Sequence, residues 1–325
     1  MRIRTLRTRQ IACMVMLAGT ISHCWAWTDR PVRVVVPAPA GGLMDAMARL
    51  LSDQLGSDLG QPVIVDNRPG AGGYIGIRAL LSSPPDGQTI MVTASNVLTE
   101  IPLVLKTNFE PLTDIKPVAS VGIARLVLVA SSDLPARDFK GLVSYVKGDP
   151  EKKSYASYST GTASHYGGVM LNQKLGLNMQ HVPFAGAPPA LVQVMGKQVT
   201  MMFDNIPNSL PLIQAGKLRP YAVTSKNRSG VLPQVPTFEE LGYPDIDFTN
   251  WVGVVVSSKV PNETAEKIRA AVAKAAASSK VRERLVAMGY EPSPAQSMTG
   301  LADATRAEYA RNASIVKTFN IHVEQ

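Results

Sequence analysis

Short apolar runs alternate with stretches of helical periodicity along most of the chain. The first run, VRVVV at 32–36, is broken by the residues PAPAGG. In the segment that follows, Met47, Leu50, Leu51 and Leu55 recur at spacings of three and four, which places their side chains on one face of a helix. Strands that alternate with amphipathic helices are typical of βαβ units and parallel sheets. The pattern therefore predicts an α/β fold.

The same rules place the remaining elements, with proline near helix starts and glycine after helix ends. We predict strands at 32–36, 63–65, 89–93, 126–130, 154–158, 179–183, 198–203, 218–224 and 251–257. We predict a first helix that begins at about residue 43 and is ended by Gly56 and Gly60. Further helices are predicted at 74–81, after Ser95-Asn96, at 138–147, at 164–175, from Pro188-Pro189 to Gly196 and at 207–215. Another helix is predicted to begin with a cap at Asn262, and two more follow it up to about Lys317.

The order of these elements indicates two domains, in keeping with a length of 325 residues. A cluster of helices after a lone strand suggests that the chain returns to cover its first sheet. We expect lobe 1 to comprise residues 27–125 and 249–325, and an inserted lobe 2 to comprise residues 126–248. The stretches 126–130 and 251–257 would cross between the lobes as a hinge, and Trp251 would pack between them. A ligand cleft is expected between the lobes.

The first 26 residues have the layout of a secretory signal peptide. Four arginines precede an uncharged segment at 11–21, and Cys24-Trp25-Ala26 supplies small residues at the expected cleavage site. The uncharged run is too short for a span, which needs roughly 20 residues. We predict export to the periplasm with cleavage after Ala26. Lipidation of Cys24 is the alternative, disfavoured because His23 stands where a small residue is usual.

The amino-acid composition excludes several classes of protein and function. With 45% hydrophobic and 18% charged residues the chain is not a disordered one. Cys13 and Cys24 both lie in the predicted leader, so the mature chain would have no thiol. Loss of the leader's arginines would lower the net charge from +8 to +4, and without a basic block or basic-aromatic alternation we predict no nucleic-acid binding.

Catalytic motifs are missing from the sequence. It contains no G-x-S-x-G, no G-K-[ST] loop and no metal spacing among His165, His181 and His322. GAGGYIG resembles a dinucleotide fingerprint, but Ile75 replaces its third glycine and the loop follows the second predicted strand. We therefore predict that the protein is not an enzyme and binds no cofactor and no metal.

Loops rich in small residues precede four predicted helices at the carboxyl ends of strands, where open parallel sheets bind ligands. A helix start leaves amide N–H groups unpaired and carries the positive end of the helix dipole, so it can hold a carboxylate or phosphate. Each loop alone could be only a tight turn, but together they favour an anion site. They are Pro39-Ala40-Gly41-Gly42, Pro69-Gly70-Ala71-Gly72-Gly73, Ser159-Thr160-Gly161-Thr162 and Ala185-Gly186-Ala187.

Polar side chains next to these loops have two interpretations each. Asp45, in the first turn of its helix, could cap the helix or bind a ligand hydroxyl or amine. Asp204, at the end of a strand, could cap the next helix or contact the ligand. Ser164 and His165 are neighbours that point roughly 100° apart on a helix, so they do not form a nucleophile and base. We expect His165 to position its loop or donate to the ligand.

Six segments together resemble the Bug family, the extracytoplasmic solute receptors of tripartite tricarboxylate transporters. They are WTDRPVRVVVPAPAGGLMDAMARLL, QPVIVDNRPGAGGYIG, PDGQTIMV, YASYSTGTASH, HVPFAGAPPALVQVMGKQVTMMFDN and IQAGKLRPYAVTS, and the match runs from about residue 27 to the end. The resemblance implies a two-lobed, hinge-closing binding protein of type II-like architecture that delivers small carboxylates to a membrane permease. In this family the first loop commonly carries a bulky aromatic where Ala38 stands, so the entrance or the ligand size should differ.

Residue patterns and resemblance together give a set of ligand-binding residues. In lobe 1 they are Ala40, Gly41, Gly42, Asp45, Gly72, Gly73, Tyr74, Ser95 and Asn96. In lobe 2 they are Thr160, Gly161, Thr162, Ser164, His165, Phe184, Ala185, Gly186, Ala187 and Asp204. Helix starts of lobe 1 would hold one carboxylate, and lobe closure would bring lobe 2 onto the remainder, so a dicarboxylate fits best.

The partners expected from this interpretation are a small carboxylate, di- or tricarboxylate and aromatic ones included, and the membrane subunits of a transporter, with the receptor itself a monomer. The sequence does not identify the solute, because backbone donors recognise anions generally. Two functions from other classes remain as alternatives: an exported hydrolase acting in the same cleft, and a surface adhesion or structural protein that has no closed state.

Overall fold

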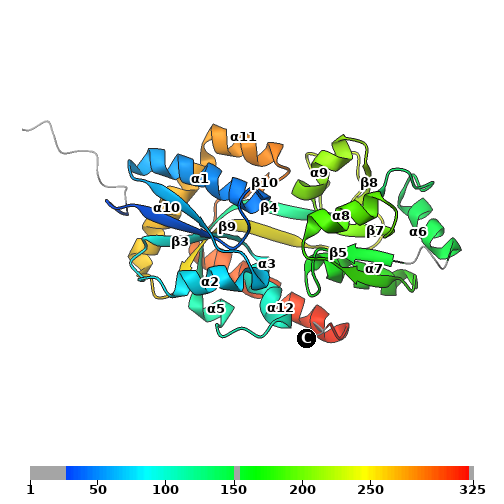
Figure 1. Cartoon of the computed structure of the whole chain (residues 1–325), viewed down its shortest axis with the longest axis horizontal. Coiled ribbons are helices and arrows are strands. Elements are labelled where there is room, and N and C mark those ends of the chain that lie inside the picture. The colour runs from blue at the N-terminus through cyan, green and yellow to red at the C-terminus, as the bar shows by residue number, and fades with distance from the viewer. Residues whose placement is uncertain (1–26, 150–153, 322–325) are drawn as a thin grey trace, which may run out of the picture.

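In the computed structural model, which describes residues 27–149 and 154–321, the chain forms two halves joined by two long strands (Figure 1). These strands are β4 (Ile115–Ser131) and β9 (Thr249–Ser257), which pair antiparallel along nearly their whole shared length. All strands belong to one sheet with the order β2-β1-β3-β9-β4-β7-β5-β6, and β8 and β10 each pair with β4. The α/β class with helices on a mostly parallel sheet is as predicted.

The first half is built on three parallel strands, β2, β1 and β3, with β9 antiparallel to β3. Its strands are β1 (Val32–Val36), β2 (Val63–Asn67), β3 (Thr89–Ala94) and β10 (Glu291–Pro292). Its helices are α1 (Leu43–Leu59), the 3₁₀ turn η1 (Ala71–Gly73), α2 (Tyr74–Leu81), α3 (Asn96–Thr99), α4 (Ile101–Val104), α5 (Pro111–Asp114), α10 (Asn262–Ala277), α11 (Ser279–Ala287) and α12 (Met298–Thr318).

The second half repeats the arrangement with β6, β5 and β7 parallel and both β7 and β8 antiparallel to the end of β4. Its strands are β5 (Ser154–Ser157), β6 (Gln180–Pro183), β7 (Met201–Asn205) and β8 (Leu218–Val223). Its helices are α6 (Phe139–Gly148), α7 (Ala163–Leu175), α8 (Ala187–Met195) and α9 (Ile206–Gln214).

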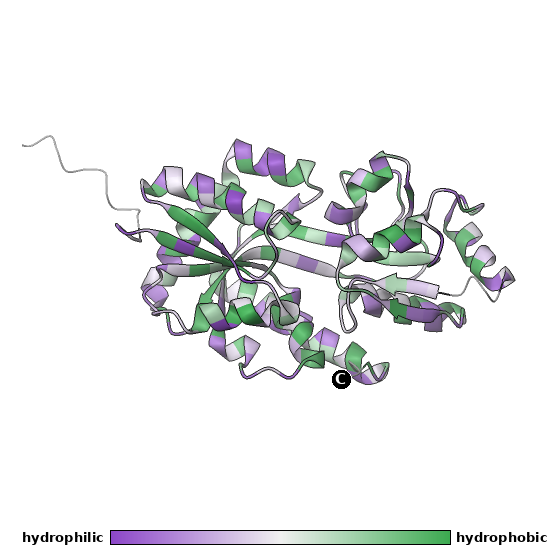
Figure 2. Cartoon of the chain, in the orientation of Figure 1, coloured by the Kyte–Doolittle hydropathy of each residue, from purple (hydrophilic) through white to green (hydrophobic). Residues whose placement is uncertain are grey.

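Each half has its own apolar core. In the first half the returning helix α10 buries Ile268 and Val272 against Leu51 and Leu55 of α1, which is the covering role predicted for the C-terminal helices. In the second half α7 packs Tyr166 against Phe203 of β7, among other residues. Figure 2 shows apolar residues gathered on the strands and hydrophilic ones on outward helix faces. None of the described helices is long and apolar enough to cross a membrane.

Helix α12 links the two cores. Leu301 near its start lies in the core of the first half, and Ile315 near its end lies in that of the second. Ser297 caps the helix start by accepting a hydrogen bond from Gly300 N at 3.0 Å. The halves are therefore connected by two strands and one helix.

Several details differ from the sequence predictions. The predicted strand at 126–130 is only the end of β4, because Pro117, Ser120 and Gly122 interrupt the apolar pattern earlier in the strand, where its register shifts. Helix α1 continues through Gly56 and ends only at Gly60, whose φ of 65° is left-handed.

Two single residues also differ. Asn262 is the first helical residue of α10 and does not cap it; its Oδ1 accepts a hydrogen bond from Lys116 Nζ at 2.7 Å. Trp251 packs with Val35, Ile77 and Leu301 in the core of the first half, so the prediction that it packs between the lobes is wrong.

Candidate functional site

Strand register brings both sets of loops to the middle of β4. In the first half the last residue of β3, Ala94, pairs with Val252 of β9, which in turn pairs with Gly122 of β4. In the second half the last residue of β7, Asn205, pairs with Leu126 of β4. These two positions on β4 are about four residues apart, or ~13 Å at the usual rise of a strand. The carboxyl ends of the two parallel sets therefore face each other, as a shared ligand site requires.

Asp45 organises the first of these loops. Its buried carboxylate accepts hydrogen bonds from Gly41 N at 2.8 Å, Arg49 Nε at 2.9 Å and Asn67 Nδ2 at 3.0 Å. The hydrogen bond from Arg49 is the main reason that the pKa of Asp45 falls to about 2. Asn67 also donates to Ala38 O at 3.1 Å. The Asp45 side chain thus ties the loop to α1 and β2; it does not cap α1, because its backbone donor Gly41 precedes the N-cap residue Gly42, and its predicted ligand contact stays a prediction.

Replacing Asp45 with alanine should therefore loosen this loop. We expect the free energy of unfolding to fall by ~1–2 kcal/mol, because a buried acceptor of three hydrogen bonds is lost. Ligand affinity should fall as well if the loop is part of the site. Thermal denaturation and calorimetry measure the two effects. Asp53→Ala, on an exposed position of the same helix, is the matched control and should change neither.

The second loop of the first half depends on glycine. Gly72 and Gly73 have φ of 62° and 99°, and a Cβ on Gly73 would lie 2.9 Å from a methyl of Val97. Tyr74 starts α2 and stacks its ring on Phe109, with centroids 5.7 Å apart. Ser95 is buried and donates to Glu308 Oε1 at 2.9 Å. The structure therefore holds Ser95 in an internal network, while its predicted ligand role stays a prediction.

In the second half, the loop before α7 is held by its own side chains. Gly161 N donates to His165 Nδ1 at 3.2 Å, and Tyr166 Oη donates to Gly161 O at 2.8 Å. Thr162 Oγ1 donates back to Ser159 O at 2.7 Å. His165 thus positions this loop, one of the two roles proposed for it.

Ser164 and His165 do not interact as nucleophile and base, because the Ser164 hydroxyl donates to Phe203 O. His165 instead stacks on His181, with ring centroids 3.8 Å apart, and Tyr155 stacks on His181 at 5.1 Å. Burial lowers the pKa of His165 to about 3, with a contribution from His181, and burial lowers the pKa of His181 to about 4. Both imidazoles are therefore neutral at pH 7.

A serine and a histidine do meet elsewhere, which the sequence did not reveal. Ser157 Oγ lies 2.7 Å from His181 Nε2. The Ser157 hydroxyl is buried and also donates to Ser159 O at 3.0 Å. The lowered pKa of His181 leaves a weak base, and among the described residues no carboxylate is recorded as a partner of its ring. This pair is consequently a structural contact.

The last two parts of the predicted ligand-binding set, the loop at 184–187 and Asp204, also form hydrogen bonds within the protein. Phe184 N and Gly186 N donate to Ser157 O at 3.0 Å and Tyr158 O at 2.9 Å. Asp204 is fully buried and accepts from Ser209 Oγ at 2.6 Å and from Asn208 Nδ2 at 3.1 Å. Burial raises its pKa to about 6. Asp204 thus secures the first turn of α9, and a ligand contact by it stays a prediction.

Two polar atoms that the sequence analysis missed are buried beside Asp204 and Ser164. The Tyr158 hydroxyl approaches the Asn205 side chain and the Ser164 amide without completing a hydrogen bond of ordinary geometry, and Asn205 Oδ1 is likewise unpaired. Buried polar atoms without partners are uncommon and point to a ligand or water. Tyr158 directly follows β5 and Asn205 ends β7, and their position at strand ends is the signal that could have identified them.

A second missed group lies where the halves meet. Glu100 Oε2 accepts a hydrogen bond from Ala163 N, the first amide of α7, at 3.0 Å. Glu308 Oε1 accepts from Thr99 Oγ1 at 2.8 Å. Burial, with repulsion from Glu308, raises the pKa of Glu100 to about 8, and burial raises the pKa of Glu308 to about 7. We call Glu100 and Glu308 the carboxylate pair.

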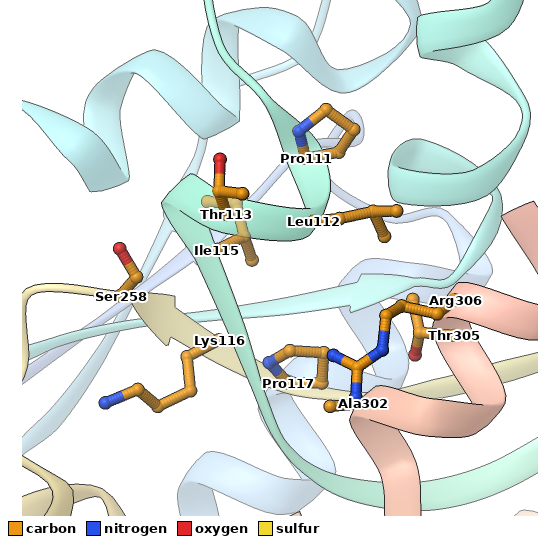
Figure 3. Close-up of a pocket in the computed structure, with 10 residues that line it drawn as sticks. All are labelled: Pro111, Leu112, Thr113, Ile115, Lys116, Pro117, Ser258, Ala302, Thr305 and Arg306. Carbon is orange, nitrogen blue, oxygen red and sulfur yellow. The ribbon is translucent and has the colours of Figure 1, made fainter. Parts of the chain in front are cut away.

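The described cavities lie away from these loops. One of about 210 Å³ is bounded by α5, the start of β4 and α12, with the Arg306 and Lys116 side chains near it (Figure 3). Another, of about 400 Å³, lies between α10 and the segment after β10, and a third is a shallow hollow at α11. None of these three is lined by a residue of the predicted ligand set.

The chemistry available at the facing loops is hydrogen bonding. Among the described residues there is no cluster of histidine, cysteine, aspartate and glutamate that could hold a metal ion. The Tyr158 hydroxyl and the helix-start amides that the hydrogen bonds above do not engage are suited to an anionic solute.

The sequence profile described as tripartite tricarboxylate transporter family receptor matches residues 47–321. BugT of Bordetella pertussis is 33% identical over 293 residues, covering 89% of each chain. Among solved structures, MatC of Rhodopseudomonas palustris with bound malate is 31% identical at a TM-score of 0.78, covering 89% of this chain and 99% of that one. A Rhodopseudomonas palustris protein with adipate is 30% identical at a TM-score of 0.83, covering 91% and 100%.

Proposed function

Because the chain belongs to the tripartite tricarboxylate transporter receptor family, we propose that it captures a small dicarboxylate between its two halves and delivers it to the membrane subunits of such a transporter. Members of this family are periplasmic solute-binding receptors, and the chain is a receptor for carboxylates, not an enzyme. The observation that carries the proposal is the convergence of helix starts from both halves at the middle of β4.

The division into lobes is part of the proposal. Lobe 1 would comprise residues 27–125 and 249–325, and lobe 2 residues 126–248. Two observations support these limits: β4 pairs with β9 up to Arg125 and with β7 from Leu126 onward, and each half has a separate apolar core. In the described part of the chain, β4, β9 and α12 extend from one half into the other, which is the arrangement expected of a hinge.

A dicarboxylate suits the donors on both sides. The relatives with malate and adipate bind molecules that carry two carboxylates. In this chain one carboxylate would meet the loops at Gly41-Gly42 and Gly72-Gly73, and the other would meet the loops of the second half and the Tyr158 hydroxyl. Helix starts stabilise such charges without cationic side chains. The first loop carries Ala38, without the bulky aromatic common in the family, and we propose that the entrance or the ligand size differs from that of relatives for this reason.

Export and assembly are also proposed. The predicted leader and its cleavage after Ala26 lie outside the described residues. The family's periplasmic role supports export of this chain. We propose that the receptor acts as a monomer that docks on the transporter's membrane subunits when closed.

The hydrolase alternative finds no support. The Ser157 and His181 side chains are paired, but Ser157 is buried and the Ser164 hydroxyl is engaged by Phe203 O. Turnover of an ester or amide by the purified protein that disappears in Ser164→Ala would overturn the receptor function.

Thermal-shift measurements with a panel of carboxylates test the proposal directly. Adipate or malate at about 100 times its dissociation constant should stabilise the folded protein by ~2.7 kcal/mol. The unfolding midpoint should then rise by roughly 4 °C. Dimethyl adipate, which has the same length without charge, is the matched control and should give no shift. If no carboxylate on the panel raises the midpoint, or the ester raises it equally, the proposed function is wrong.

A further inference from the structure

The carboxylate pair connects three elements at the junction of the halves. Glu100 lies between α3 and α4 and is 1% exposed, and Glu308 comes from α12. The Asn250 side chain of β9, oriented with its nitrogen toward them, lies 3.2 Å from Glu100 Oε1 and 3.3 Å from Glu308 Oε1. Ser95 and Thr99 add hydroxyl donors to Glu308. Two carboxylates are therefore bridged by a single neutral amide.

The pair also spans the two halves. Glu100 belongs to the first half, while its hydrogen-bond donor, Ala163 N, begins α7 in the core of the second. Val104, next to it on α4, packs against that same core and lies close to Gly161. The inference requires that a rotation of one half relative to the other breaks the contact between Glu100 and Ala163 and exposes the carboxylates to water.

Among the described residues, no ion pair neutralises the negative charge of Glu100 and Glu308. Arg311 is the cation that faces both glutamates, yet its guanidinium stacks on Phe248 at 4.7 Å and donates to Asp245 O at 3.4 Å. Within the described part of the chain no ion pair joins Arg311 to either glutamate. Two buried negative charges without a paired cation are unfavourable, and a proton relieves that repulsion.

The other titratable groups near the pair do not supply a cation. Tyr158 and Tyr166 face Glu100, and burial raises the pKa of both, so they stay neutral. Asp204 faces Tyr158, and Asp245 and Asp247 face Arg311. These aspartates add negative charge and do not remove the need for a proton at the pair.

We propose that Glu100 and Glu308 retain a proton while the halves are closed and release it when they separate, so that capture of a carboxylate is coupled to proton uptake. The inference rests on the proposed function, because it assumes that a ligand closes the halves. Glu100 and Glu308 are then positioning residues that do not touch the ligand: Glu100 acts through the α7 start, and Glu308 acts on Glu100 through their shared partner Asn250.

The direction of the pH dependence follows from the pKa values. In the structure as described, the pKa of Glu100 is raised to about 8 and that of Glu308 to about 7, from an ordinary value of 4.5. Hydration on opening lowers both again, so the closed form binds more protons. Closing is therefore favoured at pH 6, and this advantage is lost as the pH rises through 7 and 8. Affinity should fall by up to about tenfold per pH unit for each proton taken up.

Calorimetry with adipate and malate measures the coupling. Titrations at pH 7.5 in phosphate and in Tris, which differ in ionisation heat, give the number of protons taken up on binding. We expect a positive number for the wild type and a dissociation constant that rises from pH 6 to pH 9. His165 and His181 titrate near pH 3–4 and do not contribute in this range.

Single glutamine variants test whether the proton taken up on binding resides on Glu100 and Glu308. Glu308→Gln removes one charge without touching the contact to Ala163 and should reduce both the proton number and the pH dependence to less than half. Glu100→Gln should do the same. Glu263→Gln, on the exposed face of α10, should behave as the wild type. Circular dichroism confirms that each variant is folded.

Two results would overturn the inference: a dissociation constant that is the same at pH 6 and pH 9, or a proton number that is unchanged in both glutamine variants of the pair. If neither probe binds at any pH, the proposed function fails instead. Small-angle scattering of the ligand-free protein then still decides the inference. The radius of gyration should rise between pH 6 and pH 9 in the wild type and stay constant in Glu308→Gln, and an unchanged wild-type radius contradicts it.

Discussion

Replacing Gly161 with alanine should weaken the binding of adipate or malate at least tenfold, equivalent to ~1.4 kcal/mol. Gly161 has a φ of 73°, and a Cβ at this position would lie 2.4 Å and 2.5 Å from the two methyl carbons of Val104. Gly161 precedes α7 in the second half, while Val104 belongs to α4 in the first. The added methyl would therefore hold the halves apart in the place where they must meet. Calorimetry at pH 7 measures the effect.

Controls separate this clash from backbone strain. Gly176 ends the same helix with a φ of 59° and has open space around its Cβ position, so Gly176→Ala carries similar strain without a clash. Its ligand affinity should stay near that of the wild type. Val104→Ala combined with Gly161→Ala should recover only part of the lost affinity, because the Cβ at position 104 would still lie 2.8 Å from the added carbon. If Gly161→Ala binds as well as Gly176→Ala, contact between the halves at this position is not required for binding.

Local sequence patterns predicted most of the fold, and the prediction differs from the structure where a strand has no such pattern. The parallel strands of the first half are short apolar runs, and the structure places each parallel strand of both halves within a few residues of its predicted range. The first part of β4 was missed because its register shifts on either side of Ser120 break the period-two alternation. Its pairing with β9 is a long-range property that no local pattern contains.

The candidate site was only partly predictable for the same reason. Glycine loops before helices are visible in the sequence, and the structure brings four of them to facing strand ends. The sequence did not indicate that Gly41 N would be engaged by Asp45 or Gly161 N by His165. Such hydrogen bonds preorganise the loops, and they leave fewer amides for a ligand than the simplest interpretation assumes.

Glu100 shows most clearly what could not be predicted from the sequence. It stands in an apolar stretch that predicts only a short helix, and an isolated acid there has no recognisable motif. Its partners Ala163 and Glu308 are 63 and 208 positions away. The buried position becomes evident only when β3, α7 and α12 are assembled around it. A functional role that depends on three elements far apart in the sequence cannot be predicted from the spacing of residues within one of them.

Gly253 in β9 should be among the least replaceable residues of the chain. A Cβ on it would lie 2.0 Å from Ala119 O and 2.9 Å from Ser120 Cα, both backbone atoms of the neighbouring strand β4. Because β4 and β9 are the two strands shared by both halves, neither can move aside without disturbing the sheet on either side. We expect Gly253→Ala to lower the free energy of unfolding by ~3–5 kcal/mol, at the upper end for a single methyl group.

Thermal and urea denaturation measure this loss, which corresponds to a midpoint lower by roughly 6–15 °C. Gly230→Ala is the matched control, because a Cβ there meets open space and the backbone φ is an ordinary one; its midpoint should stay within a degree or two of the wild type. Equal midpoints for the two variants would mean that β9 can shift away from β4 at Gly253. The close packing of β9 on β4 at this position would then be disproved.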